Sequence, residues 1–450
     1  MLCCTDRPWM ISFRDFEHKE DVCMDRMIFS LITAIVLFAS CGERNTDSGK
    51  AFTSLLNGAK NYVTRLDELP VVAERVLIDG DTVVVCHPER LTDSIALPLS
   101  HFVEDLEIVP LEASDGAYVR NTGVYVTDNY FLLHSSRNMP FKLFTREGKF
   151  VCNIGSSGNG RGNYGQVYDF QMDEKHNRIY IMPWAARELL VYDMQGQFQG
   201  YIPLNQSGGQ TKTYGKPVFR VDGEREEITI ASIPWKRNPH IVWVQDFKGN
   251  VLRELAYNPF LVSDTYSVET YSRQNTCAFD FSVLEFYPQR NDTLYHYVRE
   301  SNILQPVFTM SFPEDRILPH SYLEHPTCFL VTTMDGMQES GLESTITYGH
   351  NEYIIDKRTL RGGKYSVYND FLGGTRTYWL KHSSGGYYVR NLSPQTLKAE
   401  LQEALSKDSL TPSIRKKLSA LAGSIDVDRD NNYLMIGRLF RFHHRDRVEE

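Results

Sequence analysis

A hairpin with a glycine in its turn recurs along the middle of the chain. The segments "KLFTREGKFV", "LVYDMQGQFQ" and "VWVQDFKGNVL" each read as a strand, a polar turn and a second strand, with Gly148, Gly196 and Gly249 in the turns. Another strand-like run, "NYFLLH", "NRIYIM" or "EEITIAS", precedes each hairpin. The turn glycines recur about every 50 residues, which is the length of a four-stranded blade. The repeat therefore predicts a β-propeller.

The glycine-rich segment "GSSGNGRGNYG", Gly155 to Gly165, raises the question of a phosphate-binding loop. Such a loop needs a helix after it, because the helix N-terminus and the backbone N–H groups bind the anion together. Here Tyr168, Phe170 and Met172 alternate with other residues at the period of a strand. The Lys-Ser/Thr ending of a phosphate loop is also missing. We therefore interpret the segment as a connection between two strands.

Charge and composition exclude one class of partner and favour one class of fold. The chain of 450 residues has a formal net charge of −9 and a sequence pI of about 5.8. Nucleic-acid binding normally needs a clustered positive surface, so we predict no nucleic-acid partner. Aromatic residues make up 12% of the chain and favour strands over helices. The length allows one large repeat domain or two or three ordinary domains.

The N-terminal region carries the pattern of an export signal. An apolar run from Ile28 to Ala39 is too short to span a bilayer as a helix but suits a signal peptide. It ends in "FASC", which resembles the lipobox of lipoproteins, although Phe38 replaces the usual aliphatic residue. A plain secretory signal or a buried strand is the alternative. We predict a signal peptide over residues 1–40, a lipid anchor on Cys41 and a polar tether over 41–70, with an over-extended start before Met24.

One repeat unit resembles a known family. The segment from "GKFVCNIG" to "LLVYDMQGQF" resembles an NHL-type repeat, with its glycine-spaced loop, the aromatic Tyr164, a strand ending in Asp173 and the "IYI" strand. From Leu97 to Phe440 the chain resembles the six-bladed β-propeller lipoproteins of Gram-negative gut bacteria. The order of "LPLSHFVEDLEIVPLEAS", the glycine-rich loop, "NDTLYHY" and "DRDNNYLMIGRLF" carries that resemblance. It implies a fold and an outer-membrane location, facing the periplasm or the outside, but no chemistry.

We therefore predict an all-β, six-bladed propeller over residues 71–450. Blades one to three contain the three hairpins, blade four "NDTLYHYVRE" and "QPVFTMSF", blade five "CFLVTTM", "STITYG" and "NEYIIDKR", and blade six runs from "TYWLKH" to "YLMIGRLF". A ring of sheets leaves an unpaired edge unless it is closed. We therefore expect the segment between Val76 and Val109 to give a strand to blade six.

A helical hairpin is expected to interrupt blade six at about residues 393–423. Ser393-Pro394 and Thr411-Pro412 are N-cap and Pro starts, and Gly423 is the expected stop. We expect the hairpin to pack on the propeller, although a partner-binding helix pair is the alternative. The apolar stripes that would pack are Leu397, Leu401 and Leu405 on the first helix and Ile414, Leu418 and Leu421 on the second.

The sequence contains no strong catalytic signal. It has no HExxH, GxSxG, EF-hand or sialidase Asp-box motif, and we predict no catalytic residue, metal or cofactor. Aspartate and glutamate are plentiful, so a glycosidase pair is geometrically possible, but the sequence singles out none. His443 and His444 lie in a polar tail, which we interpret as solvated. The cysteines after Cys41 have no CxxC spacing, and we expect them to be small buried residues: Cys86, Cys152, Cys277 and Cys328.

Two Pro-Trp pairs follow the second strand of blades two and three. Pro183-Trp184 and Pro234-Trp235 occupy equivalent repeat positions, and NHL repeats usually have an Asp there. In a four-stranded blade this connection and the loop between blades lie on one face, so we expect one rim beside the central channel. Exposed aromatic rings stack on sugars or peptides, and Arg binds carboxylates. The candidate ligand-binding residues are Arg161, Tyr164, Trp184, Arg187, Trp235, Lys236 and Arg237.

Two functions remain open at this point. The first is a non-catalytic envelope lipoprotein whose propeller face binds a glycan or a protein partner, and which touches the membrane only through its lipid. The second is a propeller enzyme of the lactonase, lyase or glycosidase type with a site in the central channel. Both Trp residues could instead fill the seams between blades. We favour the binding protein.

Overall fold

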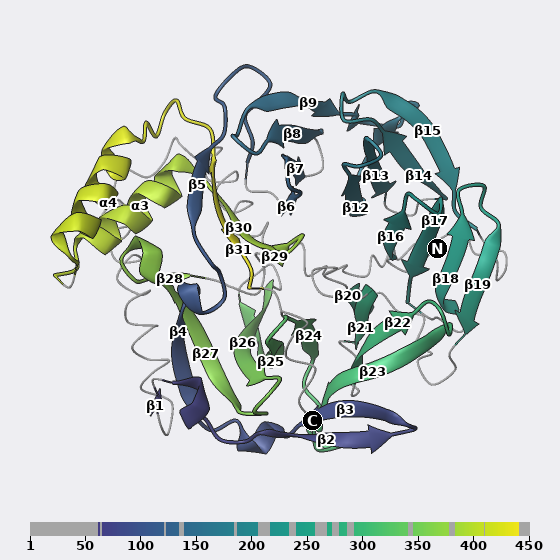
Figure 1. The fold of residues 1–450 in the computed structure, drawn as a ribbon, viewed down its shortest axis with the longest axis horizontal. Helices are drawn as coiled ribbons and strands as arrows, with labels where there is room; N and C mark the ends of the chain where they lie inside the picture. Colours follow the sequence, from purple (N-terminus) through teal and green to yellow (C-terminus); the bar gives the residue numbers. More distant parts are fainter. Residues whose placement is uncertain are drawn as a thin grey trace, which may run out of the picture.

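The computed structural model is a ring of six β-sheets around a central axis (Figure 1). It confirms the predicted all-β, six-bladed propeller with two helices near the C-terminus. The residues that the structure describes are 62–63, 65–120, 123–134, 139–183, 187–205, 217–233, 240–256, 268–271, 279–285, 292–340, 345–377, 383–408 and 410–440.

Blades one to three are antiparallel four-stranded sheets built from consecutive strands. The turn glycines Gly148, Gly196 and Gly249 have φ of 81°, 80° and 86°. This left-handed conformation is easy only for glycine, which explains the repeat seen in the sequence. The strands are β6 (Gly123–Val126), β7 (Tyr130–His134), β8 (Phe141–Thr145), β9 (Phe150–Ile154), β12 (Val167–Asp173), β13 (Arg178–Pro183), β14 (Glu188–Tyr192), β15 (Phe198–Pro203), β16 (Val218–Asp222), β17 (Glu227–Ala231), β18 (His240–Asp246) and β19 (Val251–Ala256).

Blades four and five are widened by strands from the N-terminal part of the chain. In blade four, β3 (Asp81–Cys86) pairs parallel with β23 (Ile303–Met310), and β2 (Ala73–Ile78) pairs with β3. In blade five, β4 (Ser94–Pro98) pairs parallel with β27 (Gly362–Asn369), and β1 (Tyr62–Val63) pairs with β4. The remaining strands of these blades are β20 (Val268–Tyr271), β21 (Phe279–Glu285), β22 (Thr293–Val298), β24 (His320–Glu324), β25 (Cys328–Ser340), β26 (Thr345–Asp356) and β28 (Thr375–Thr377).

These outer strands correct the predicted extent of the tether. We placed residues 41–70 in a polar tether, but Tyr62 and Val63 pair with β4, and Leu69 is fully buried against blade five. Burying a leucine side chain stabilises the fold by about 1.5–3 kcal/mol, so this end of the segment belongs to the propeller. The short 3-10 helices in these connections are η3 (Leu66–Glu68), η4 (Pro88–Arg90), η5 (Leu99–His101) and η7 (Asp370–Leu372).

The ring closes in blade six, as the sequence predicts. This blade contains β29 (Ser383–Ser384), β30 (Tyr387–Leu392), β31 (Tyr433–Arg438) and β5 (Glu107–Pro110). β5 runs antiparallel to β31, with Val109 opposite Leu434. The N-terminal part of the chain therefore supplies the outermost strand of the last blade.

The helical hairpin lies outside blade six and packs on it (Figure 1). The helices are α3 (Pro394–Leu405) and α4 (Pro412–Ser424), and the side chains of Ser393 and Thr411 cap their N-termini. Of the predicted stripes, Leu397 and Leu401 are fully buried, Leu418 is 3% exposed, and Leu405, Ile414 and Leu421 pack against the same core. Gly423 is not the stop, because α4 continues to Ser424.

Arg390 on β30 fixes α3 with a bidentate ion pair. Its two terminal nitrogens donate to the Glu400 carboxylate at 3.0 and 2.7 Å. Arg390 is 8% exposed, and fork-to-fork geometry of this kind gives both strength and a fixed orientation. None of the helices among the described residues has the length and apolar character needed to cross a membrane.

The hydrophobic cores lie between adjacent blades. Blades one and two, for example, share a cluster that includes Leu132, Ile154 and Ile181. Cys86 and Cys328 are buried free thiols, as predicted, and burial raises the pKa of each to about 12. Cys152 is free and half-buried, whereas Cys277 lies outside the described residues.

Candidate functional site

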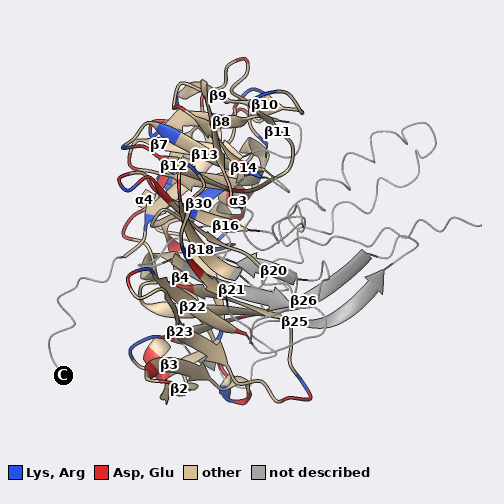
Figure 2. Ribbon diagram, turned by 90° about the vertical axis from the view of Figure 1, so that its right-hand side faces the viewer, with Lys and Arg blue, Asp and Glu red and all other residues tan. Residues whose placement is uncertain are grey.

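The two faces of the propeller carry different connections. We call the face with the interblade loops and the second-to-third strand connections the loop face, and the opposite one, with the tight glycine turns, the turn face. The glycine-rich segment joins β9 to β12 on the loop face and forms a parallel pair, β10 (Ser156–Ser157) with β11 (Asn163–Tyr164). These two short strands lie on the right-hand side of the edge-on view in Figure 2. A strand follows the loop, as predicted, and not the helix that a phosphate loop needs.

Tyrosine hydroxyls hold this loop at Gly162. The Gly162 N–H donates to the Tyr201 hydroxyl at 3.1 Å, and the Tyr192 hydroxyl donates to the Gly162 carbonyl. The Ser156 hydroxyl also donates to the Asn163 side chain at 2.7 Å across the loop. The loop is therefore fixed on blade two by its own backbone.

The glycines of the loop are required by the aromatic rings beneath it. Gly155 has φ of 63°, and a Cβ there would lie 2.7 Å from atoms of both Tyr164 and Tyr192. Gly162 has φ of 73°, and its Cβ would lie 2.8 Å from the Phe198 ring. Gly155 and Gly162 therefore let the loop approach a layer of aromatic side chains, a close approach for which glycine is the usual residue.

Tyr164 does not belong to the ligand-contacting rim that we predicted. It is 3% exposed and lies in the core between blades one and two. Its hydroxyl donates to the Ile154 carbonyl and accepts from the Phe141 N–H at 2.8 Å. Burial raises the pKa of Tyr164 well above its usual range. Its ring cannot stack on a ligand, because neighbouring side chains already cover it.

Arg161 is exposed at the tip of the loop and lies over an aromatic pair. Its guanidinium carbon is 5.9 Å from the centroid of Phe198. Phe198 in turn meets Tyr201 edge to face at 4.8 Å, and Tyr201 is 42% exposed. We call Arg161, Phe198 and Tyr201 the rim cluster. It is suited to stacking on an apolar sugar face or a peptide while Arg161 pairs with a carboxylate.

The rim cluster lies at the outer edge of the loop face. Phe198 and Tyr201 belong to β15, the outermost strand of blade two. We predicted that Arg161 would lie beside the central channel, but its contact with Phe198 places it at the outer edge instead. Arg187 is exposed on the same face, and its carbonyl accepts from the Leu204 N–H at 2.8 Å, next to the end of β15. Cys41, Trp184, Trp235, Lys236 and Arg237 lie outside the described residues.

Sequence reasoning missed Phe198 and Tyr201. The available signal was their position in "GQFQGYIP", two and five residues after the turn glycine Gly196. The last strand of a blade is the outermost one, so an aromatic residue on it that points away from the core stays exposed.

Comparison with known proteins identifies the family. A family model described as a domain of unknown function, DUF4934, matches residues 82–438, well over half of the chain. The chain belongs to this family. No curated protein sequence gives a significant match.

Two solved structures resemble this DUF4934 chain. A Bacteroides fragilis protein that carries the provisional description of an exported protein is 17% identical, with a TM-score of 0.50 over 77% of this chain and 99% of that one. A DUF4221 family member from Bacteroides vulgatus is 11% identical, with a TM-score of 0.42 over 75% and 97%. At such identity the first of these likenesses shows the fold alone.

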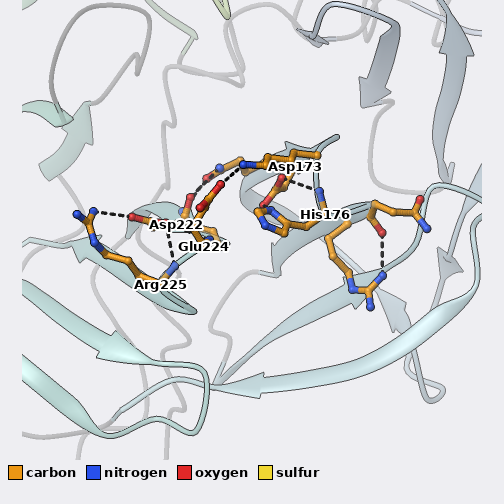
Figure 3. A network of polar contacts seen from close by, with 10 residues as sticks. Asp173, His176, Asp222, Glu224 and Arg225 are labelled. Atoms are coloured by element: carbon orange, nitrogen blue, oxygen red, sulfur yellow. Dashed lines mark hydrogen bonds and ion pairs between the residues drawn. The ribbon is translucent and has the colours of Figure 1, made fainter.

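The turn face of the DUF4934 chain carries charged turns that cross-link neighbouring blades (Figure 3). Lys175 of blade two pairs with Glu224 of blade three. Within each turn, Asp173 lies 2.8 Å from His176, and Asp222 lies 2.9 Å from Arg225. The Lys175–Glu224 ion pair therefore joins blades two and three, and the other two contacts hold each turn in place.

A cavity of about 220 Å³ opens between blades five and six on the turn face. His101, His325 and Asp356 are among its lining residues, and burial lowers the pKa of both histidines, that of His325 to about 3. The Asp356 carboxylate accepts from the Arg358 and Thr359 N–H groups, which fixes it in its own turn. Within the described part of the chain, no group of three or more His, Cys, Asp or Glu side chains could hold a metal ion.

Proposed function

We propose that this protein is a non-catalytic, lipid-anchored protein of the cell envelope that binds an acidic glycan or a protein partner through the loop face. The observation that carries the proposal is the rim cluster, where the exposed Tyr201 of β15 lies beside Arg161, on a loop that tyrosine hydroxyls fix through its backbone. A surface that is ordered before binding loses less conformational entropy on binding.

The chemistry of the cluster supports this class of ligand. Tyr201 offers a flat ring at the surface, and Arg161 is a cation exposed beside it. Arginine binds carboxylates through two parallel N–H donors, so a ligand with an apolar face and a carboxylate fits both. Arg187 would extend the same surface toward the end of β15.

Export and lipid anchoring are supported by observations other than the rim cluster. The lipobox-like "FASC" predicts a lipid on Cys41, and a protein of similar fold carries the provisional description of an exported protein. Replacing Cys41 with Ser should release the protein from the membrane fraction. Unchanged fractionation of Cys41→Ser would exclude the anchor but leave the binding surface untested, so the two parts are separable.

The binding part is tested with the mature protein on an array of neutral and uronate-containing glycans, and by pull-down from envelope extracts. Arg161→Ala and Tyr201→Ala should each weaken capture by about tenfold or more, as expected at a binding hot spot. Tyr118→Ala is the matched control, because Tyr118 is 46% exposed but lies in the connection between β5 and β6, outside the rim cluster. Equal capture by the wild type and both rim variants would refute the proposal.

A further inference from the structure

The seam between blades six and one carries two arginines on the turn face. Arg146 comes from the turn between β8 and β9 in blade one, and Arg438 ends β31 in blade six. Tyr387 begins β30 and is the direct cross-strand partner of Arg438. The Arg146 N–H donates to the Asn129 carbonyl at 2.9 Å, which fixes this turn on the neighbouring one. Figure 1 shows blade six beside β6–β9 at this seam.

Both guanidinium groups are held by aromatic rings. The Arg146 guanidinium carbon is 4.8 Å from the centroid of Phe131 and 5.1 Å from that of Tyr387. The Arg438 carbon is 5.6 Å from the Tyr387 centroid, and its Nη2 donates to the Tyr387 hydroxyl at 3.2 Å. Phe131 is fully buried and Tyr387 is 6% exposed, so these rings form a rigid wall.

Neither arginine forms an ion pair within the described part of the chain, although the exposed Glu147 follows Arg146 in the turn and interacts with it electrostatically. One edge of Arg146 is covered, because its Nη1 is buried without a hydrogen-bond partner against the two rings. The side chain as a whole is half-buried, so its other edge is open, and Arg438 is exposed. A half-buried cation that stacking orients but does not neutralise attracts an anion more strongly than a fully hydrated one.

A second acid lies close to this pair. Asp128 is exposed, and its Oδ1 accepts from the Tyr387 hydroxyl at 3.3 Å. It orients the tyrosine, and its negative charge opposes an incoming anion. Asp128 should therefore weaken anion binding, and its removal should strengthen it.

From this arrangement we propose that Arg146 and Arg438 form a binding site for an oxyanion group, a carboxylate or a phosphate or sulfate, on the turn face of the closure seam. The open edge of Arg146 supplies the inner donors, and Arg438 supplies the outer ones. Guanidinium donors match the oxygens of such groups in geometry and charge. The bound oxyanion group belongs either to a free inorganic anion or to an acidic sugar of a glycan. This site is separate from the rim cluster, which lies on the opposite face.

The test measures binding to the mature protein by calorimetry and by thermal shift at constant ionic strength. The probes are inorganic phosphate, sulfate, glucuronate and, as the neutral match, glucose. The wild type should be stabilised by at least one anion and not by glucose. Binding of glucuronate identifies an acidic sugar, whereas binding of phosphate or sulfate alone identifies an inorganic or esterified anion.

Variants connect binding to the two arginines. Arg438→Gln removes an exposed charge with little effect on folding and should weaken binding about tenfold. Arg146→Lys keeps the charge but loses the planar fork and should also weaken it. Asp128→Asn should tighten binding, an effect that a purely structural role of Asp128 would not produce. The proposal is overturned if no anion stabilises the protein beyond chloride, or if Arg438→Gln and Asp128→Asn bind as the wild type does.

Discussion

The two seams that flank blade one are stabilised in different ways. Next to the seam with blade six, β5 and β31 of that blade come from opposite ends of the propeller and pair through their backbones. Across this seam, Gly148 of blade one packs on the Pro110 carbonyl of β5. At the seam with blade two, each blade keeps its own four strands. There the glycine-rich loop lies over Tyr164, Tyr192 and Phe198.

The two seams differ in how far apart in the sequence the residues that form them lie. The seam with blade two is built by residues from consecutive blades, so it can form as soon as these blades have folded. The closure seam needs β5 and β31 together, and the entropy of closing the intervening loop has to be overcome first. We therefore expect damage at the closure seam to affect the whole ring, and damage at the other seam to stay smaller.

The largest effect is expected from a deletion after Ala422. This deletion removes β31, which pairs with β30 on one side and β5 on the other. Blade six then has no central strand, and the protein should lose its cooperative thermal transition, as measured by circular dichroism. A deletion after Phe440 keeps β31 whole and is the control. A cooperative melt of the shorter protein would contradict this account of ring closure.

The next largest loss of stability is expected from substituting a glycine at the closure seam, compared with a glycine at the seam with blade two. Gly148→Val places a Cβ on the Pro110 carbonyl and forces a left-handed backbone on a branched residue, so it should cost about 3 kcal/mol of unfolding free energy. Gly162→Val carries the same left-handed strain, but its side chain meets only the ring of Phe198, which can shift, so it should cost less. Gly165→Ala is the control, because no atom lies within 4 Å of its added Cβ. Chemical denaturation measures all three, and a larger loss for Gly162→Val would reverse the comparison.

Sequence reasoning predicts the parts of this fold that local residue requirements determine. The turn glycines predict blades one to three because each of those turns needs a left-handed residue. Ser393 and Thr411 predict the helix starts because their side chains accept hydrogen bonds from N–H groups of the first turn. By contrast, β2, β3 and β4 join blades four and five through parallel pairing with β23 and β27, far away in sequence. No local pattern specifies such a partner, and we did not predict these outer strands.

The candidate site was less predictable, because exposure depends on what packs around a residue. Tyr164 and Tyr201 are both tyrosines of blade two, yet one is 3% and the other 42% exposed. The glycine-rich loop covers the first, whereas the second lies on the outermost strand. A composition argument could identify an aromatic and arginine surface near the loop, but it could not decide which tyrosine forms it.

A third prediction uses the buried tyrosine. Tyr164→Phe keeps the ring but removes the hydroxyl that bonds to the Ile154 carbonyl and the Phe141 N–H. Buried backbone groups left without a partner cost about 1–3 kcal/mol, so the variant should lose that much stability. Tyr118→Phe, at an exposed site, should stay within about 0.5 kcal/mol of the wild type. Equal stability of both variants would show that the hydroxyl of Tyr164 does not hold the seam.

The smallest effect on stability is expected at Tyr201. Its ring is partly exposed, and its hydroxyl only accepts one hydrogen bond from the loop, at Gly162. Tyr201→Phe should therefore cost about 0.5–1 kcal/mol, and less than Tyr164→Phe does, because water can replace the lost acceptor. The matched pair Tyr164→Phe and Tyr201→Phe thus separates the buried half of the aromatic layer from its exposed half. If Tyr201→Phe is the more destabilising of the two, Tyr201 is a packing residue and the loop at Gly162 depends on it for its position.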